Sequence, residues 1–203
     1  MDIYQYDNSL REKGLKKIAG IDEAGRGPLA GPVVAAAVVL PEGVRIDGLR
    51  DSKKVPENER EHLFAKIALL SEDIGIGIIS NEDIDRLNIL KSTKLAMKYA
   101  VENLSQLPDI LIIDAVTLTS IPVRQISFIK AEEISSSVAA ASIVAKVLRD
   151  NIMISYHKQY PNYNFIKNKG YATKEHLELL KIYGPCPIHR KSFQRVMTLE
   201  LPF

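Results

Sequence analysis

The stretch that most constrains the fold of this chain runs from Ile18 to Leu40, where two apolar segments flank a short polar motif. The first segment leads directly into two neighbouring acids, Asp22 and Glu23. Carboxylates at the end of a buried strand are costly to desolvate unless a cation or several hydrogen bonds compensate. Neighbouring side chains of a strand point to opposite faces, so we expect the chain to leave the regular pleat here if both acids share one cation.

The polar motif continues with Gly25, Arg26 and Gly27 before the second apolar segment begins at Val33. The two glycines allow the backbone to approach a ligand closely, and the arginine between them supplies a fixed cation. An ordinary strand–turn–strand unit would give the same apolar pattern. A turn does not need two acids, an arginine and two glycines in six consecutive residues, so the motif favours a functional site.

Apolar runs along the rest of the chain predict an α/β fold. We expect strands over residues 17–23, 33–40, 74–79, 110–113 and 123–129, helices over 56–70, 88–104, 135–160 and 174–182, and an irregular tail from 184. Glycine alternates with apolar residues in the third strand, and small residues fill the first half of the long helix, so neighbouring backbone can approach both closely. This order of elements is typical of helices that cover a mixed sheet.

Charge is unevenly distributed along a chain whose net charge is only +2. Residues 1–130 carry a net −2 and residues 131–203 a net +4. Five of the eight tyrosines lie between Tyr156 and Tyr183. The basic residues around them are Lys158, Lys167, Lys169, Lys174, Lys181, Arg190, Lys191 and Arg195. Basic residues interleaved with aromatic ones suit nucleic acid, although such a stretch is as often only a solvated surface.

The sequence carries no sign of a membrane protein or of export. Its longest apolar runs, 33–40 and 138–147, are too short to span a bilayer, and the polar first residues lack the apolar region of a signal peptide. We therefore expect a cytoplasmic protein. The single cysteine, Cys186, lies between two prolines and is interpreted as a loop residue. Among the four histidines we expect only His189, beside Arg190, to lie near a substrate.

Acids also close two further predicted strands. Asp114 follows the apolar run 110–113, and Glu132 follows the run 123–129. Either acid alone is explained by a turn or by a cap on the next helix. With the two acids of the first strand they make four carboxylates at strand ends, where α/β sheets place their sites. A site of oxygen ligands selects Mg²⁺ or Mn²⁺, and two such ions about 3.5–4 Å apart would serve phosphodiester cleavage.

Several motifs resemble those of one family. They are DEAGRGP at 22–28, DSKK at 51–54, LNIL at 87–90, AAASIVAKVLRD at 139–150 and KGY at 169–171. In these motifs, and over residues 18–193, the chain resembles the type 2 ribonuclease H family, ribonuclease HII. The resemblance implies a ribonuclease H-like α/β fold, with a five-stranded mixed sheet flanked by helices and a C-terminal helical extension. We expect a catalytic domain over 1–160 and, over 161–203, a basic, tyrosine-rich extension of it that contacts the substrate.

The resemblance also implies an activity. Members of the family are endonucleases that hydrolyse the RNA strand of RNA/DNA hybrids and cut duplex DNA 5′ of an embedded ribonucleotide, leaving 3′-hydroxyl and 5′-phosphate ends. The family's metal-binding acids match Asp22, Glu23, Asp114 and Glu132. At the last position the family usually has aspartate, and Glu133 is the neighbouring alternative. We expect these acids to hold two Mg²⁺ or Mn²⁺ ions for hydrolysis without a covalent enzyme intermediate, and we interpret Asp150 as an ion-pair partner of Lys146.

The substrate contacts implied by the resemblance match Gly25, Arg26, Gly27 and Tyr171. The Gly-Arg-Gly element would recognise the 2′-hydroxyl, which distinguishes RNA from DNA, by close backbone approach. The tyrosine would pack on the deoxyribose that follows the ribonucleotide. Phosphate contacts are expected from Lys53, Lys54 and Lys169. Asn168 occupies a position that is commonly histidine in the family, so a phosphate contact there would differ.

Other functions fit parts of the pattern. A non-catalytic nucleic-acid-binding module would bind without metal-dependent turnover, and an enzyme acting on a small phosphorylated substrate would not need a basic, aromatic surface. A related nuclease or integrase of the same fold would lack the Gly-Arg-Gly element. We expect partners to be RNA/DNA hybrid and ribonucleotide-containing duplex DNA, with no membrane, no sliding-clamp motif in the tail and a monomeric state.

Overall fold

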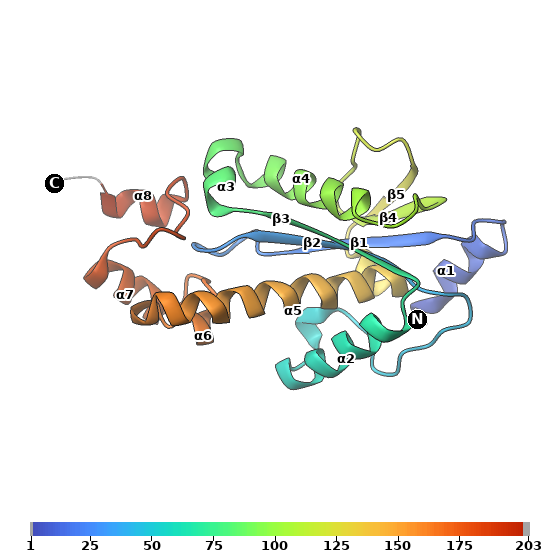
Figure 1. Ribbon diagram of the computed structural model, residues 1–203, viewed down its shortest axis with the longest axis horizontal. Coiled ribbons are helices and arrows are strands. Elements are labelled where there is room, and N and C mark those ends of the chain that lie inside the picture. Colours follow the sequence, from blue (N-terminus) through green and yellow to red (C-terminus); the bar gives the residue numbers. More distant parts are fainter. Residues whose placement is uncertain (1, 201–203) are drawn as a thin grey trace.

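The computed structural model describes residues 2–200 and contains one five-stranded sheet with helices on both faces (Figure 1). The strands are β1 (Ile18–Ala24), β2 (Val33–Val39), β3 (Asp73–Ile79), β4 (Ile110–Asp114) and β5 (Arg124–Phe128). The helices are α1 (Tyr4–Arg11), α2 (Glu57–Leu70), α3 (Asn81–Leu87), α4 (Ile89–Glu102), α5 (Ser136–Gln159), α6 (Phe165–Asn168), α7 (Lys174–Tyr183) and α8 (Gln194–Glu200). Short 3₁₀ helices are η1 (Ser52–Lys54), η2 (Ala131–Glu133) and η3 (Pro161–Tyr163).

The sheet has the strand order β3-β2-β1-β4-β5, with β1 at its centre. Strands β3, β2 and β1 pair antiparallel, whereas β1, β4 and β5 pair parallel, so the predicted mixed sheet is confirmed. Parallel pairing of β1 and β4 reaches Ile21 and Ile113. The acids that follow these two residues are therefore brought to the same edge of the sheet.

Two helices cover most of the sheet, α5 on one face and α4 on the other (Figure 1). The first half of α5 is buried among the side chains of β1 and β2, as its small residues predicted. On the other face, a Cβ added at Gly77 of β3 would lie 1.9 Å from the carbonyl oxygen of Ala96 in α4. The glycines of β3 therefore permit the close helix approach that their alternation indicated.

The C-terminal part packs around its own apolar cluster, against the end of α5 and the loop between β1 and β2. The cluster contains Leu29, Ala30, Met153, Tyr163, Phe165, Leu180, Cys186, Ile188 and Val196. The expectation of an irregular tail from residue 184 was wrong, because α8 forms there with Val196 fully buried. Helices α1 and α3 were also not predicted. The start of α3 is capped by Ser80, whose hydroxyl accepts from the backbone N–H of Asp83.

In the part of the chain that the structure describes, none of the helices has the length and apolar character needed to cross a membrane. One apolar groove lies between the edge strand β3 and α5, lined in part by Ile76, Ile78 and Ile152. A monomer was expected because no helix or strand was left with an unexplained apolar face. This groove is such a face, so the monomeric state stays a prediction.

Candidate active site

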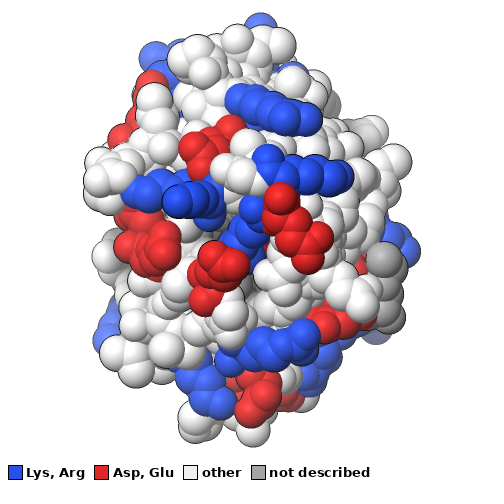
Figure 2. Space-filling model, turned by 90° about the vertical axis from the view of Figure 1, so that its right-hand side faces the viewer, with Lys and Arg blue, Asp and Glu red and all other residues white. Residues whose placement is uncertain are grey.

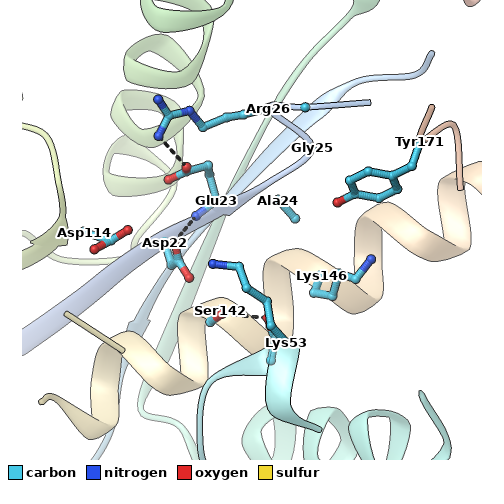
Figure 3. Close-up of a pocket in the computed structure, with 12 residues that line it drawn as sticks. Asp22, Glu23, Ala24, Gly25, Arg26, Lys53, Asp114, Ser142, Lys146 and Tyr171 are labelled. Carbon is cyan, nitrogen blue, oxygen red and sulfur yellow. Dashed lines mark hydrogen bonds and ion pairs between the residues drawn. The ribbon is translucent and has the colours of Figure 1, made fainter. Parts of the chain in front are cut away.

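A cleft of about 370 Å³ lies where β1 and β4 end (Figure 3). Five segments that are distant in sequence contribute to its wall. The lining residues are Asp22 to Gly27, Ser52, Lys53, Asp114, Ser142, Lys146 and Tyr171. Eight of the residues expected to act on substrate or metal are thus brought together: Asp22, Glu23, Gly25, Arg26, Gly27, Lys53, Asp114 and Tyr171.

Asp22 and Glu23 lie on opposite faces of β1, because the strand continues through both acids to Ala24. The chain thus keeps the regular pleat at these acids, so the condition set for sharing one cation within the strand is not met. Asp22 points towards Ser142 of α5, whereas Glu23 points towards Arg26, whose Nη1 lies 3.3 Å from the glutamate Oε1 (Figure 3). Any cation shared by the two acids must therefore sit beyond the end of the strand.

The acids of β1 are poorly compensated. Burial raises the pKa of Asp22 well above its usual value, and the charges of Glu23 and Asp114 act in the same direction. Hydrogen bonds from Ser142 and from the backbone N–H of Glu23 oppose that rise. Burial also raises the pKa of Glu23, against the effect of the Arg26 cation. The site thus lacks enough positive charge for its carboxylates.

A hydrogen bond joins the end of β4 to the turn that carries the fourth acid, Glu132. Asp114 accepts a hydrogen bond of 3.1 Å from the backbone N–H of Ala131, the first residue of η2. The turn begins at Lys130, whose φ of 61° is left-handed. This geometry buries Glu132, which is only 4% exposed, while Glu133 faces outwards and pairs with Lys54 at 2.7 Å. Of the two neighbouring acids, only Glu132 is turned inwards.

Glu132 shows a further sign of an incomplete site. Its Oε2 is buried and has no hydrogen-bond partner, and burial raises the pKa of the carboxyl group. The nearest cation is Lys53, whose Nζ lies 3.8 Å from Oε1. Glu132 does not line the cleft itself, but the nearby charge of Asp114 adds to the effect of burial in raising the pKa of its carboxyl group.

These residues fit a divalent metal centre. Their donors are all oxygens, one buried acceptor is unpaired, and hard cations such as Mg²⁺ and Mn²⁺ prefer oxygen ligands. Within residues 2–200, no three acidic, histidine or cysteine side chains are already arranged to hold a metal. The acids would therefore have to draw together around an ion, whose positive charge would offset the repulsion between them.

The cleft is also lined by three polar residues that were not expected to act on substrate or metal, namely Ser52, Ser142 and Lys146. Ser142 hydrogen bonds to Asp22 and lies 2.8 Å from the hydroxyl of Ser52, so its role is not only helix packing. Lys146 forms the expected ion pair with Asp150 at 2.8 Å. A signal was available, because residues 142, 146 and 150 fall on one face of a helix at i, i+4 spacing.

Two of the expected phosphate contacts lie outside the cleft. Lys169 is only 8% exposed, and its ammonium group donates to the carbonyl of Ile166 and pairs with Glu57. Lys54 pairs with Glu133. Asn168 is also buried, where its side chain accepts from the N–H of Gly170 and shapes the turn before the expected sugar contact.

The expectation that His189 lies near substrate was wrong. His189 and Arg190 are both completely buried, and Cys186, a loop residue as expected, is buried beside the histidine with its Sγ 3.1 Å from Nδ1. The basic surface expected from the C-terminal charge is therefore smaller than the sequence indicated, since Arg190 and Lys169 belong to the interior. On the face drawn in Figure 2, basic and acidic side chains lie interspersed.

A mixed five-stranded sheet with buried acids at the ends of its central strands is the architecture of the ribonuclease H-like nucleases. Within that class, the family profile of ribonuclease HII matches residues 19–196, and the chain belongs to the ribonuclease HII family. It is accordingly an endonuclease, a hydrolase of phosphodiester bonds.

Individual relatives agree with this assignment. The ribonuclease HII of Acetivibrio thermocellus is 55% identical over 190 residues, which cover 94% of this chain and 74% of that protein. The crystal structure of ribonuclease H2 from Pyrococcus horikoshii OT3 is similar with a TM-score of 0.75 and 28% identity, covering 91% of this chain and 97% of that one. A chain from the PCNA:RNase HII complex of Archaeoglobus fulgidus has a TM-score of 0.75 and 26% identity, with 92% and 98% covered.

Proposed function

We propose that this chain cuts the RNA strand of RNA/DNA hybrids and cuts duplex DNA on the 5′ side of an embedded ribonucleotide, leaving 3′-hydroxyl and 5′-phosphate ends. The observation that carries the proposal is that one cleft holds both Asp22 with its neighbouring acids and the Gly25–Gly27 turn with Tyr171. The acids that would serve phosphodiester cleavage thus lie beside the turn and the tyrosine that would contact a ribose. Residues 1–160 would supply the chemistry and residues 161–203 further substrate contacts.

The four acids Asp22, Glu23, Asp114 and Glu132 are the proposed ligands of two Mg²⁺ or Mn²⁺ ions. When bound, such ions activate a water molecule and stabilise the leaving oxygen. The hydroxyl of Ser142 favours the charged form of Asp22, which is the form that binds a cation. The unpaired Oε2 of Glu132 supplies an acceptor that the protein itself does not use. No side chain of the cleft is needed as a covalent nucleophile.

Substrate recognition is assigned to the other wall of the cleft. The backbone of Gly25, Arg26 and Gly27 would contact the 2′-hydroxyl, and the 40% exposed ring of Tyr171 would pack on the next sugar. The ring lies 5.4 Å from Nζ of Lys146, so a cation lies close to the sugar contact. Lys53, whose side chain is 79% exposed, would bind a phosphate.

Cutting is proposed to need no sliding clamp. The Archaeoglobus fulgidus relative was solved in a complex with PCNA, whereas the tail of this chain lacks the paired aromatic residues of a clamp motif. Part of that tail, residues 201–203, lies outside the described residues. Adding a clamp to the cleavage reaction should leave the rate on a short duplex unchanged.

The decisive test uses a labelled DNA duplex with one ribonucleotide, an all-DNA duplex and an RNA/DNA hybrid. Each is incubated in Mg²⁺, in Mn²⁺ and in chelator. We expect metal-dependent cutting 5′ of the ribonucleotide and within the hybrid RNA, no cutting of the all-DNA duplex, and loss of cutting in Asp22→Asn. Binding of the duplexes without cutting in either metal would overturn the proposal.

A further inference from the structure

Arg190 is a completely buried arginine whose guanidinium group hydrogen bonds only to backbone carbonyls. It donates to Gly25 at 2.6 Å, Gly31 at 2.9 Å, and Arg26 and Pro32 at 3.1 Å each. Among residues 2–200, no carboxylate lies within ion-pair distance of it. A buried cation is costly, and the carbonyl dipoles that offset this cost belong to the loop that forms the ribose side of the cleft.

The contacts with Gly25 and Arg26 determine where the loop's amide groups point. All peptide bonds in the described chain are trans, and in a trans peptide the C=O and N–H point in opposite directions. Because Arg190 draws the carbonyls of Gly25 and Arg26 inwards, the N–H groups of Arg26 and Gly27 face away from it. Neither N–H has an acceptor within residues 2–200. Consecutive free amides of this kind form a concavity that binds oxygen atoms.

Arg190 remains a cation under the conditions in which the enzyme would work. Burial, with the nearby charge of Arg149, lowers the pKa of Arg190 to about 9. Arg149 holds the other side of the same loop, donating to the carbonyls of Pro32 and Ala30 at 3.0 and 3.1 Å. Its remaining hydrogen bond goes to the carbonyl of Lys169, close to the second ribose-contacting element.

A chain of hydrogen bonds connects the same C-terminal segment to Tyr171. The N–H of Cys186 donates to Nδ1 of His189 at 2.9 Å, so the proton of that ring is on Nε2. This Nε2–H donates to Nε2 of His176 at 3.1 Å, and the Nδ1–H of His176 donates to the carbonyl of Tyr171 at 2.8 Å. Both imidazoles are fully buried and each has one defined tautomer.

Residues 186–190 thus connect the two elements that would contact the sugar. The N–H of Arg190 also donates to the carbonyl of Leu29 at 2.8 Å, and the N–H of Leu29 donates to the carbonyl of Gly170 at 2.8 Å. The Gly25–Gly27 turn and the Tyr171 turn are therefore held at a set separation by the interior of the protein and not by the surface of the cleft.

We propose that Arg190 and the His189–His176 pair are positioning residues for ribose recognition: Arg190 aims the amides of Arg26 and Gly27 into the cleft, and the histidine pair sets Tyr171 against them. The inference rests on the proposed function, because it requires that this wall of the cleft recognises the ribonucleotide. The proposal means that buried residues, which do not touch the substrate, contribute to the preference for a ribonucleotide over DNA.

The test measures selectivity separately from stability. Binding of a single-ribonucleotide duplex and of an all-DNA duplex is measured in chelator for wild type, Arg190→Lys and Ile67→Ala, an apolar truncation on the buried side of α2, away from the cleft. Melting temperatures identify any general destabilisation. We expect Arg190→Lys to lose at least about tenfold of the preference for the ribonucleotide, with DNA affinity retained, while Ile67→Ala keeps the full preference.

The outcomes separate the two proposals. Wild type without any preference would overturn the proposed function, and the inference with it. A wild type that discriminates and an Arg190→Lys variant that discriminates equally well would overturn the inference alone. If Arg190→Lys does not fold, Gly27→Pro removes one of the outward amides and is compared with wild type and Ile67→Ala. A full preference for the ribonucleotide in Gly27→Pro would likewise contradict the inference.

The histidine pair is tested by a double-mutant cycle. His189→Leu and Tyr171→Ala are each expected to lower kcat/KM for the ribonucleotide duplex, and the double variant should be no worse than Tyr171→Ala alone. Additive losses would show that His189 acts only through stability, and would exclude its role in positioning Tyr171.

Discussion

Lys53 places its ammonium group 3.8 Å from Oε1 of Glu132, although the lysine side chain is 79% exposed and that of the glutamate only 5%. The lysine thus reaches from solvent into the buried end of the acid cluster. It lies along the wall of the cleft, where a phosphate of the substrate would pass. A cation in this place can compensate an acid in the free enzyme and a phosphate in the complex.

Lys53→Met should weaken binding of a hybrid duplex and reduce its salt dependence. Loss of one phosphate contact lowers the slope of log K against log salt by about 0.9. Binding titrations in chelator at several salt concentrations measure the slope. Lys66→Met, on the exposed side of α2, is the matched control and should leave the slope unchanged. Equal slopes for Lys53→Met and wild type would exclude the contact.

Asp22→Asn should abolish cleavage and also stabilise the protein. The buried carboxylate is crowded by Glu23 and Asp114, so its neutral analogue removes repulsion, and gains at such sites are commonly about 0.5–2 kcal/mol. The loss of activity should reach about 10³-fold or more if Asp22 holds the catalytic ions. Melting temperature in chelator and cleavage rate in Mg²⁺ are the two measurements.

Asp150→Asn is the contrasting variant. Asp150 is equally buried, but it pairs with Lys146 at 2.8 Å, so its removal should destabilise the protein by about 1–3 kcal/mol. If both variants melt at a lower temperature than wild type, repulsion among the cleft acids is not a feature of the folded protein.

Divalent metal should stabilise the protein through the same acids. A ligand at 100 times its Kd adds about 2.7 kcal/mol to the free energy of unfolding, so Mn²⁺ or Mg²⁺ should raise the melting temperature and chelator should reverse the change. In a variant that combines Asp22→Asn with Glu132→Gln, the shift should be absent. A shift that persists there would place the metal elsewhere.

Acid should destabilise the C-terminal cluster through His189. Burial, and then the neighbouring His176, lower the pKa of His189 to about 4 from 6.5. Above pH 6.5 the ring is neutral in both folded and unfolded chains and has no effect. As the pH falls from 6.5 to 4, only the unfolded chain takes up the proton, so the free energy of unfolding decreases, by about 3 kcal/mol in all.

Urea unfolding at pH 7.5, 6 and 5 measures this loss. Among the described residues, the titratable side chains against the histidine are Tyr163, Cys186 and His176, and none of them supplies a negative charge in this pH range. His189→Leu should flatten the dependence in this range. The same steepness in wild type and variant would assign the acid sensitivity to other groups.

Much of the fold and part of the site follow from local patterns. Apolar runs that end in acids predicted β1 and β4 and the meeting of Asp22, Glu23 and Asp114, because strand periodicity and burial are properties of neighbouring residues. The glycines of β3 and the small residues of α5 predicted close packing for the same reason. The tail helix α8 was missed because its apolar contact, Val196, is buried by a partner remote in sequence.

The sequence by itself determined the residue types of the cleft and the strands that carry its acids. Only the tertiary structure decided which charged groups are interior. Glu132 is turned inwards and Glu133 outwards by a left-handed turn at Lys130, and Lys169 and Arg190 exchange solvent for partners far along the chain. At these positions a charged side chain is buried because other segments supply its hydrogen bonds, and a local pattern carries no record of those partners.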